Sequence, residues 1–143
     1  MKTIKDIKII DLTSYIEDGV LVPIEFKKDI PFEVNRLFYV FGVPSEQPRG
    51  QHAHYKTKQI LTCLNGTIEC ICKDGYGGKI NFQLNDPTKG VYIPEMIWDE
   101  QVYKSNQSFL LSICSTSYDP NDYINDYEEF KKLKKETINA SVI

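Results

Sequence analysis

Gly, Pro, Asn and Asp divide this chain into short segments rich in β-branched and aromatic residues, and this division restricts the fold more than any other feature. Segments of this kind predict strands. The Asn65-Gly66 pair between two of them predicts a tight hairpin turn. The expected strands span residues 7–12, 19–26, 34–43, 49–55, 58–66, 66–75, 79–84, 90–98, 99–104 and 108–117. Many short strands with frequent turns are typical of an all-β sandwich or barrel.

One helix is predicted near the end of the chain, over about residues 120–136. Asp119 suits its N-cap and Pro120 its first position, because Pro lacks the backbone N–H that the first turn leaves unpaired. Acidic residues come early in this segment and lysines late, which suits the helix dipole. We expect the helix to lie on the outside of the sheet. Tyr118 and Tyr123 could form the rim of a pocket or pack with the helix, and packing is the favoured interpretation.

The length of 143 residues suits a single domain over residues 1–143. The formal net charge of −3 gives no general attraction to nucleic acid or to an anionic membrane. No apolar run approaches the length of a membrane span, and the charged N-terminal segment lacks the apolar region of a signal peptide. We therefore expect a cytoplasmic protein whose four cysteines are reduced structural residues.

The two histidines of the chain, His52 and His54, lie one residue apart in a strand-like segment. Residues i and i+2 of a strand point to the same face, so the two imidazoles are expected to lie side by side. Such a pair can bind a divalent metal, transfer protons, or form hydrogen bonds inside a core. The pair by itself leaves these three uses open.

The residues around the histidines resemble the first motif of the cupin superfamily, which is Gly-x-His-x-His followed by a glutamate and a glycine. The matching positions here are Gly50, His52, His54, Gln59 and Gly66. The second cupin motif is matched by Gly90 and Pro94, with Asp99 at the place of its histidine. An amide is a poor transition-metal ligand compared with a carboxylate, so we expect no metal and read the histidines as a general acid and base. A set of two histidines and one carboxylate, His52, His54 and Asp99, remains the metal-binding alternative.

A closer resemblance covers the chain from about Ile7 to Phe130. The segments "RLFYVFGVPSEQPRGQHAHYKTKQILTCLNGTIEC", "GVYIPEMIW" and "SYDPNDYINDYEEF" are similar to those of the dTDP-sugar 3,4-ketoisomerases. The resemblance implies an all-β cupin, a jelly-roll barrel of antiparallel strands with one C-terminal helix. It implies a dTDP-linked 4-keto-6-deoxyhexose as substrate and no cofactor. It also implies a homodimer in which the N-terminal strands, about residues 7–26, are exchanged.

The resemblance further implies that the enzyme moves the keto group of dTDP-4-keto-6-deoxyglucose from C4 to C3 through an enediol or enediolate. His52 and His54 are then the catalytic pair, with His52 expected as the base and His54 as the residue that shuttles protons or orients its neighbour. Tyr39 is the candidate donor for the developing oxyanion. The product would feed the synthesis of a 3-amino-3,6-dideoxy sugar for a surface glycan.

The expected substrate-binding residues are Arg36, Arg49, Gln59 and Trp98. Arg36 and Arg49 are the two arginines of the chain, and a guanidinium binds phosphate through two parallel hydrogen bonds, so they are assigned to the pyrophosphate. Gln59 is expected to contact the sugar, and Trp98 to line its pocket. Asp99 departs from the resemblance, because relatives commonly carry a basic or imidazole side chain there. Asp99 would act as an acid only with a raised pKa, or would pair with one of the histidines.

Two other functions remain open from the sequence. One is a metal-dependent cupin enzyme, such as a small dioxygenase. The other is a non-catalytic cupin that binds a nucleotide sugar. Activity that survives a chelator would exclude the first, and turnover of the sugar would exclude the second.

Overall fold

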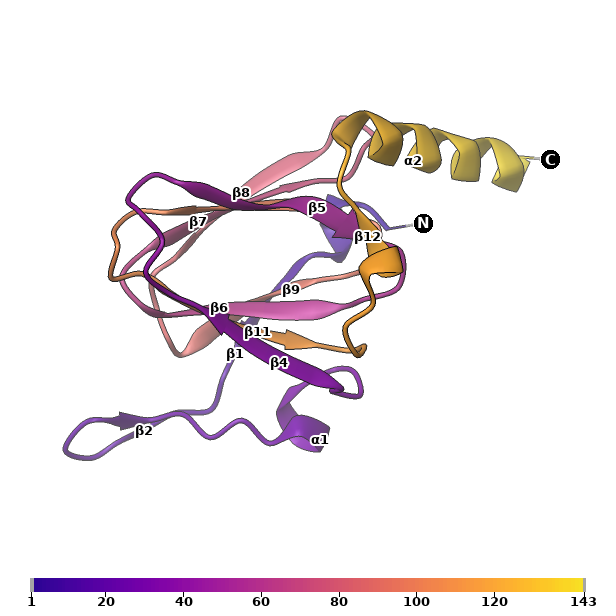
Figure 1. The fold of residues 1–143 in the computed structure, drawn as a ribbon. Coiled ribbons are helices and arrows are strands. Elements are labelled where there is room, and N and C mark those ends of the chain that lie inside the picture. Colours follow the sequence, from indigo (N-terminus) through magenta and orange to yellow (C-terminus); the bar gives the residue numbers. More distant parts are fainter. Residues whose placement is uncertain (1, 143) are drawn as a thin grey trace.

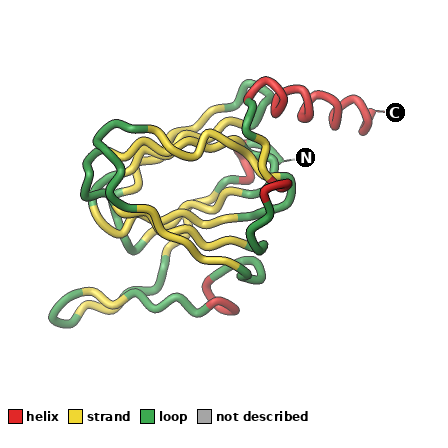
Figure 2. The backbone as a smooth tube through the Cα atoms, in the orientation of Figure 1, coloured by secondary structure: helices red, strands yellow, loops and turns green. Residues whose placement is uncertain are grey.

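The computed structural model describes residues 2–142 of the chain, and most of its regular elements are short strands (Figures 1 and 2). The strands are β1 (Lys8–Asp11), β2 (Tyr15–Ile16), β3 (Val20–Leu21), β4 (Arg36–Val40), β5 (Pro48–His54), β6 (Gln59–Asn65), β7 (Ile68–Lys73), β8 (Lys79–Leu84), β9 (Lys89–Ile93), β10 (Trp98–Tyr103), β11 (Phe109–Cys114) and β12 (Tyr123–Ile124). The helices are the 3-10 turns η1 (Ile4–Asp6) and η2 (Pro120–Asp122), the short α1 (Phe26–Asp29) and the C-terminal α2 (Tyr127–Val142).

Two antiparallel sheets of five strands face each other and form a flattened barrel (Figure 1). One sheet has the strand order β1-β9-β6-β11-β4, and the other has the order β12-β5-β10-β7-β8. Neighbours in each sheet are often distant in the sequence, as expected for a jelly roll rather than for a simple meander. The predicted antiparallel β-barrel with a C-terminal helix is therefore confirmed.

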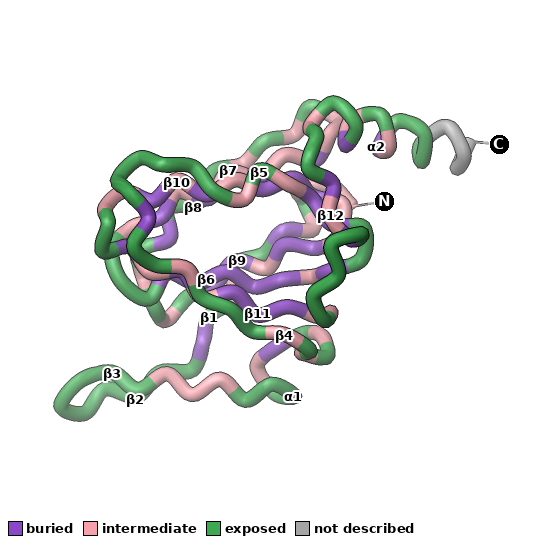
Figure 3. Tube along the Cα trace, in the orientation of Figure 1, coloured by how far each residue is buried: buried purple, intermediate pink, exposed green. Residues whose placement is uncertain are grey.

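The main core lies between the two sheets, and most of the buried residues in Figure 3 belong to their strands. Strand β7 alternates buried and half-buried residues, because one face meets the core and the other is only partly covered. Strand β6 is buried on both faces over its first five residues. Its outer face carries Ile60, which packs with Ile30 and Ile113 under the segment that follows β3.

The C-terminal helix begins later than the sequence predicted. Asp119 does cap a helical turn, and its carboxylate accepts a hydrogen bond from the Asn121 N–H at 2.9 Å. This turn is the single 3-10 turn η2, which ends because Tyr123 and Ile124 pair with β5. The chain re-enters a helix at Tyr127. The strand pairing therefore overrides a local helix signal.

The first turns of helix α2 pack on the outer face of the sheet that contains β5. Phe130 packs there with Ala53 and Trp98, and all three are buried. Trp98 was expected to line the sugar pocket, and this placement is wrong. Its neighbour Asp99 faces the barrel interior, so the strand alternation turns Trp98 outward under the helix.

A β-bulge interrupts the pairing of β5 with β10 just before the histidines. Asp99 pairs with His52, whereas the next residue, Glu100, pairs with Gly50, so Gln51 is the extra residue. Gly50 and Gln51 both have positive φ, of 79° and 58°. A bulge changes the phase of a strand, and bulges often lie beside active sites. Here it places Arg49 and His52 in one cavity, although they are three positions apart and would point to opposite faces of a regular strand.

The N-terminal segment contributes both to the barrel and to a projection from it. Strand β1 pairs with β9 of the same chain. Strands β2 and β3 pair only with each other and extend away from the barrel (Figure 1). Within residues 7–26, β1 therefore belongs to the barrel of its own chain, and the β2–β3 hairpin is the part that projects.

Candidate functional site

The barrel contains an open cavity of about 390 Å³ between the two sheets. Its polar wall is formed by Arg36, Arg49, His52, Gln59, Gln101 and Tyr123. Four of these were expected at the site, and the structure brings them together. Apolar side chains from β4, β6 and β11 complete the lining. A mainly apolar cavity with a few convergent polar groups is typical of a small-molecule site.

His52 lines this cavity, and the bulge determines which of its ring nitrogens carries the proton. Nδ1 lies 3.1 Å from the carbonyl oxygen of Gly50. A carbonyl oxygen can only accept a hydrogen bond, so Nδ1–H is the donor. Nε2 of the neutral ring is then unprotonated and can accept a proton. The same bulge therefore orients His52 and sets its tautomer.

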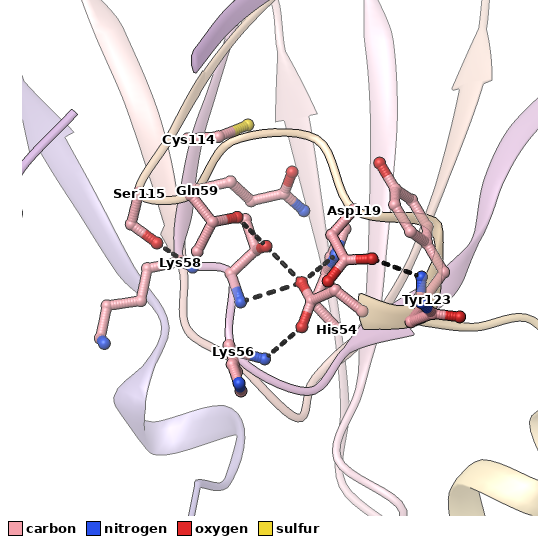
Figure 4. A network of polar contacts seen from close by, with 12 residues as sticks. His54, Lys56, Lys58, Gln59, Cys114, Ser115, Asp119 and Tyr123 are labelled. Atoms are coloured by element: carbon pink, nitrogen blue, oxygen red, sulfur yellow. Dashed lines mark hydrogen bonds and ion pairs between the residues drawn. The ribbon is translucent and has the colours of Figure 1, made fainter. Parts of the chain in front are cut away.

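His54 lies behind His52 and is 5% exposed. The two rings meet edge to face, with centroids 4.9 Å apart. Nδ1 of His54 lies 3.1 Å from Oδ2 of Asp122, which fixes the Nδ1–H tautomer here too (Figure 4). The histidines are side by side as predicted, but His54 contacts Asp122 rather than the cavity.

The Asp122 carboxylate is held by several donors from the loop after β5. It accepts hydrogen bonds from the backbone N–H of Lys56 at 2.8 Å, from the N–H of Thr57 at 3.3 Å, and from the Thr57 hydroxyl. Burial alone would raise the pKa of Asp122, but these hydrogen bonds and the nearby His54 outweigh it, so its pKa lies below the ordinary value. Asp122 is therefore a carboxylate at neutral pH.

Burial lowers the pKa of His54 to about 4, and repulsion from His52 adds to this effect, while Asp122 partly opposes it. His54 is therefore neutral at neutral pH. In the unfolded chain the pKa of a histidine is about 6.5. Between pH 6.5 and pH 4 the unfolded chain binds more protons at this position, so the free energy of unfolding falls as the pH falls through this window.

We expect His54 to make the protein about 2 kcal/mol less stable at pH 5 than at pH 7. Denaturant unfolding of the wild type and of His54→Gln at both pH values measures this contribution. Glutamine keeps a donor for Asp122 but does not titrate, so the loss should be about 2 kcal/mol smaller in the variant. Equal losses in the two proteins would contradict a buried neutral His54.

Tyr123 supplies the phenol of this cavity, a position that the sequence analysis had given to Tyr39. The ring of Tyr123 lies over both imidazoles, with centroid distances of 5.0 Å to His52 and 4.5 Å to His54. Tyr39 lies on the outer face of β4 and is 59% exposed. It stacks on Phe109 with a centroid distance of 5.3 Å. The assignment of Tyr39 to the oxyanion is wrong, because residues 36, 38 and 40 of the same strand line the cavity.

Asp99 is fully buried behind the polar wall rather than in it. Its carboxyl group accepts a hydrogen bond from Gln101 Nε2 at 2.5 Å and a long one from Gln59 Nε2 at 3.5 Å. Burial raises the pKa of Asp99, although the nearby His52 and the Gln101 hydrogen bond oppose this effect. The partner of a histidine is thus Asp122, and Asp99 holds the two amides at the back of the cavity.

Arg49 lies where two cavities meet. It lines the histidine cavity and also a second cavity of about 480 Å³ beside the loop between β4 and β5. Within residues 2–142, no Asp or Glu side chain forms an ion pair with either arginine. Both guanidinium groups are therefore free to bind an anionic ligand.

Residues 2–142 contain neither a metal-binding cluster of side chains nor a membrane-spanning helix. Across residues 2–142, no three or more His, Cys, Asp or Glu side chains gather in a way that could hold a metal ion. The helices within the same range include none that is both long and apolar enough to cross a membrane.

Asp122 and Gln101 were not predicted at the site. Tyr118 and Tyr123 were expected to pack with the helix rather than to form a pocket rim, but both line the cavity. Asp122 and Tyr123 were part of the segment "SYDPNDYINDYEEF", which was read as the start of a helix. No local signal marked them as site residues, because their position depends on the pairing of Tyr123 and Ile124 with β5. Gln101 carried no signal of its own, because its position opposite Arg49 depends on the bulge.

Comparisons with known proteins agree with this architecture. The family described as "FdtA: WxcM-like, C-terminal" matches residues 5–135. TDP-4-oxo-6-deoxy-alpha-D-glucose-3,4-oxoisomerase of Aneurinibacillus thermoaerophilus is 39% identical over 126 residues, which are 87% of this chain and 90% of that protein.

Two solved structures have the same cupin-like fold. The sugar 3,4-ketoisomerase QdtA of Thermoanaerobacterium thermosaccharolyticum, in complex with TDP, has a TM-score of 0.88 and 34% identity over 92% of this chain and 96% of its own. A 3,4-ketoisomerase of Helicobacter canadensis has a TM-score of 0.86 and 34% identity over 91% of this chain and 98% of its own. The chain belongs to the WxcM-like FdtA family, whose relatives include the sugar 3,4-ketoisomerases.

Proposed function

We propose that this protein is a sugar 3,4-ketoisomerase that converts dTDP-4-keto-6-deoxyglucose into a dTDP-3-keto-6-deoxyhexose. The observation that carries the proposal is the tautomer of His52, that is, which of its ring nitrogens holds the proton. Its Nδ1–H is bonded to the Gly50 carbonyl, which leaves Nε2 as a base in the wall of a cavity. The relatives support the substrate, since QdtA was crystallised with TDP, and a histidine-to-asparagine variant of QdtA with TDP-4-keto-6-deoxyglucose.

The reaction needs only proton transfers. The C4 ketone acidifies the proton on C3, and His52 Nε2 removes it to give an enediolate with negative charge on the C4 oxygen. A proton is then delivered to C4, and the proton on the C3 oxygen is transferred to the C4 oxygen, which leaves a ketone at C3 and a hydroxyl at C4. Neutral His54, bonded to the Asp122 carboxylate, supports a positive charge on the adjacent His52. Arg49 binds the pyrophosphate beside the second cavity, and Gln59 and Gln101 face the sugar.

The direct test is proton NMR of dTDP-4-keto-6-deoxyglucose in deuterated water with the purified protein. We expect a new 3-keto sugar with deuterium at C4, at the same rate with and without a chelator. An unchanged substrate spectrum with no exchange at C3 would reject the isomerase and leave nucleotide-sugar binding. Loss of turnover with chelator, and its recovery with added metal, would favour the metal-dependent alternative.

We also propose that the product serves the synthesis of a dTDP-3-amino-3,6-dideoxy sugar for a surface glycan. A ketone at C3 is the group that an aminotransferase converts into an amine. The proposed location is the cytoplasm, where nucleotide-activated sugars are made. A coupled assay with a sugar aminotransferase should convert the 3-keto product into the amine, and an unmodified product would reject this placement.

We further propose that the protein acts as a homodimer. Strand β4 is at the edge of its sheet. The outer face of β4 carries Tyr39, which is exposed to solvent and stacks on Phe109. The β2–β3 hairpin projects from the barrel and exposes Ile16 (84%) and Leu21 (64%) (Figure 1). An apolar hairpin and an exposed apolar strand edge require a partner, and a second copy supplies both complementary surfaces.

Replacing Ile16 and Leu21 together with lysine should convert the dimer into a monomer, because two buried apolar contacts would become unpaired charges. Sedimentation velocity measures the change. Ile138→Lys is the matched control, since Ile138 is also exposed but lies on α2, at the opposite side of the barrel from the hairpin (Figure 1), and this variant should stay dimeric. A dimeric double variant would show that the hairpin is not part of the interface.

A further inference from the structure

We infer that the two arginines have different functions, and that Arg36 with Tyr123 forms a binding site for the enediolate oxygen while Arg49 alone binds the phosphates. This inference rests on the proposed isomerase activity. It revises the initial assignment of both guanidinium groups to the pyrophosphate, and it adds Tyr123 to the groups that contact the reacting atoms.

Arg36 is held at the histidine end of the cavity. Its Cζ lies 5.7 Å from the ring centroids of both Phe38 and Tyr118, so the guanidinium is positioned by two aromatic rings. Its Nη1 donates to the hydroxyl oxygen of Tyr123 at 3.3 Å. Its Nε is buried and has no hydrogen-bond partner among the described residues. The cation is thus fixed in place without an acidic partner.

The hydroxyl of Tyr123 is therefore polarised in one direction. Its oxygen accepts from Arg36, which leaves its own hydrogen to be donated to another group. The ring stands 5.0 Å from that of His52, so the phenol and the proposed base lie side by side in the wall of the same cavity. A phenol that donates next to the base is the arrangement that an enediolate needs, because negative charge develops on an oxygen attached to the carbon next to the deprotonated one.

Arg49 occupies a different place. It lies on β5 just before the bulge, where it pairs with Gln101 of β10. Its side chain lines both the histidine cavity and the second cavity. A pyrophosphate joins the sugar to the nucleoside, so the group that binds it must lie between the sites for these two parts. Arg49 lines both cavities and Arg36 lines only the first.

The test compares Arg36→Ala, Arg49→Ala and Tyr123→Phe by steady-state kinetics, by C3 proton exchange and by calorimetric binding of dTDP. Arg36→Ala should lower kcat about 100-fold or more, as the loss of an oxyanion donor does, with the Kd for dTDP within about threefold of the wild type. Tyr123→Phe should show the same pattern. Arg49→Ala should raise KM and the Kd for dTDP together, by about 10-fold or more. Millimolar guanidinium, but not sodium, should restore turnover in Arg36→Ala.

Three outcomes would overturn the inference. One is a Kd for dTDP that rises as much in Arg36→Ala as in Arg49→Ala, and another is a Tyr123→Phe variant with wild-type kcat. The third is a folded Arg36→Ala variant whose turnover guanidinium does not restore. If the alanine variant does not fold, Arg36→Lys takes its place in the comparison. All three can occur while the wild type isomerises the sugar. A wild type without turnover would instead reject the proposed function, so the two failures are distinguishable.

Discussion

Replacing His52 with asparagine should abolish exchange of the C3 proton and lower kcat by about 1,000-fold or more, which lies within the range that one general base contributes. Asparagine can still donate to the Gly50 carbonyl, so the bulge should be retained. It has no nitrogen that accepts a proton, so the first step of the reaction is lost. The readouts are deuterium incorporation at C4 and the initial rate of 3-keto sugar formation.

The same variant should bind dTDP as the wild type does, because Arg49 and the second cavity are unchanged. Gln51→Asn is the matched control, since residue 51 is exposed in the same bulge and asparagine tolerates its positive φ of 58°. This control should keep kcat within about threefold, as expected for an exposed substitution without backbone strain. Normal exchange in His52→Asn would show that another residue is the base.

Local sequence patterns were sufficient to predict the β-barrel and the side-by-side placement of the two histidines. Turn residues bounded most strands correctly, and the i, i+2 spacing of His52 and His54 placed both rings in one cluster. The same alternation, applied strictly, would have corrected two site assignments. Arg36 and Tyr39 are an odd number of residues apart on one strand, and Trp98 is adjacent to Asp99, so neither pair can share a face.

The remaining site features depend on contacts between distant segments, which no local pattern contains. The bulge at Gln51 is defined by the register of β5 against β10. Asp122 reaches His54 because Tyr123 and Ile124 add a short strand beside β5, at a position where local propensity favours a helix. Tertiary pairing commonly overrides propensity in this way. The carboxylate that pairs with His54, that of Asp122, is therefore identified only from the folded structure.

Asp122→Asn tests this long-range contact, and we expect it to lower kcat by about 100-fold, in the range of a lost acid–base partner. The amide removes the negative charge beside His54, whose ring packs against both His52 and Tyr123. Without the Asp122 carboxylate, a positive charge on the histidine pair is stabilised less, so protonated His52 is harder to form. The acidic limb of the pH–rate profile should therefore move to lower pH.

Asp122→Ala should have a second effect, a loss of about 2–4 kcal/mol in the free energy of unfolding. The truncation leaves the buried N–H groups of Lys56 and Thr57 and the Thr57 hydroxyl without their acceptor. Asp119→Ala is the matched control: Asp119 caps η2 one turn earlier but is exposed, so its loss should cost about 1 kcal/mol and leave the pH–rate profile in place.

Nitrogen NMR of the imidazoles separates positioning from simple packing. In the wild type, His54 should remain the Nδ1–H tautomer down to about pH 4, because its proton is donated to the Asp122 carboxylate. In Asp122→Asn the tautomers should mix while the fold is kept. If the variant kept both the single tautomer and the wild-type profile, the carboxylate would only support the loop after β5. A mixed tautomer with reduced kcat would instead place Asp122 in the proton-transfer chain, acting on the sugar through His54 and His52.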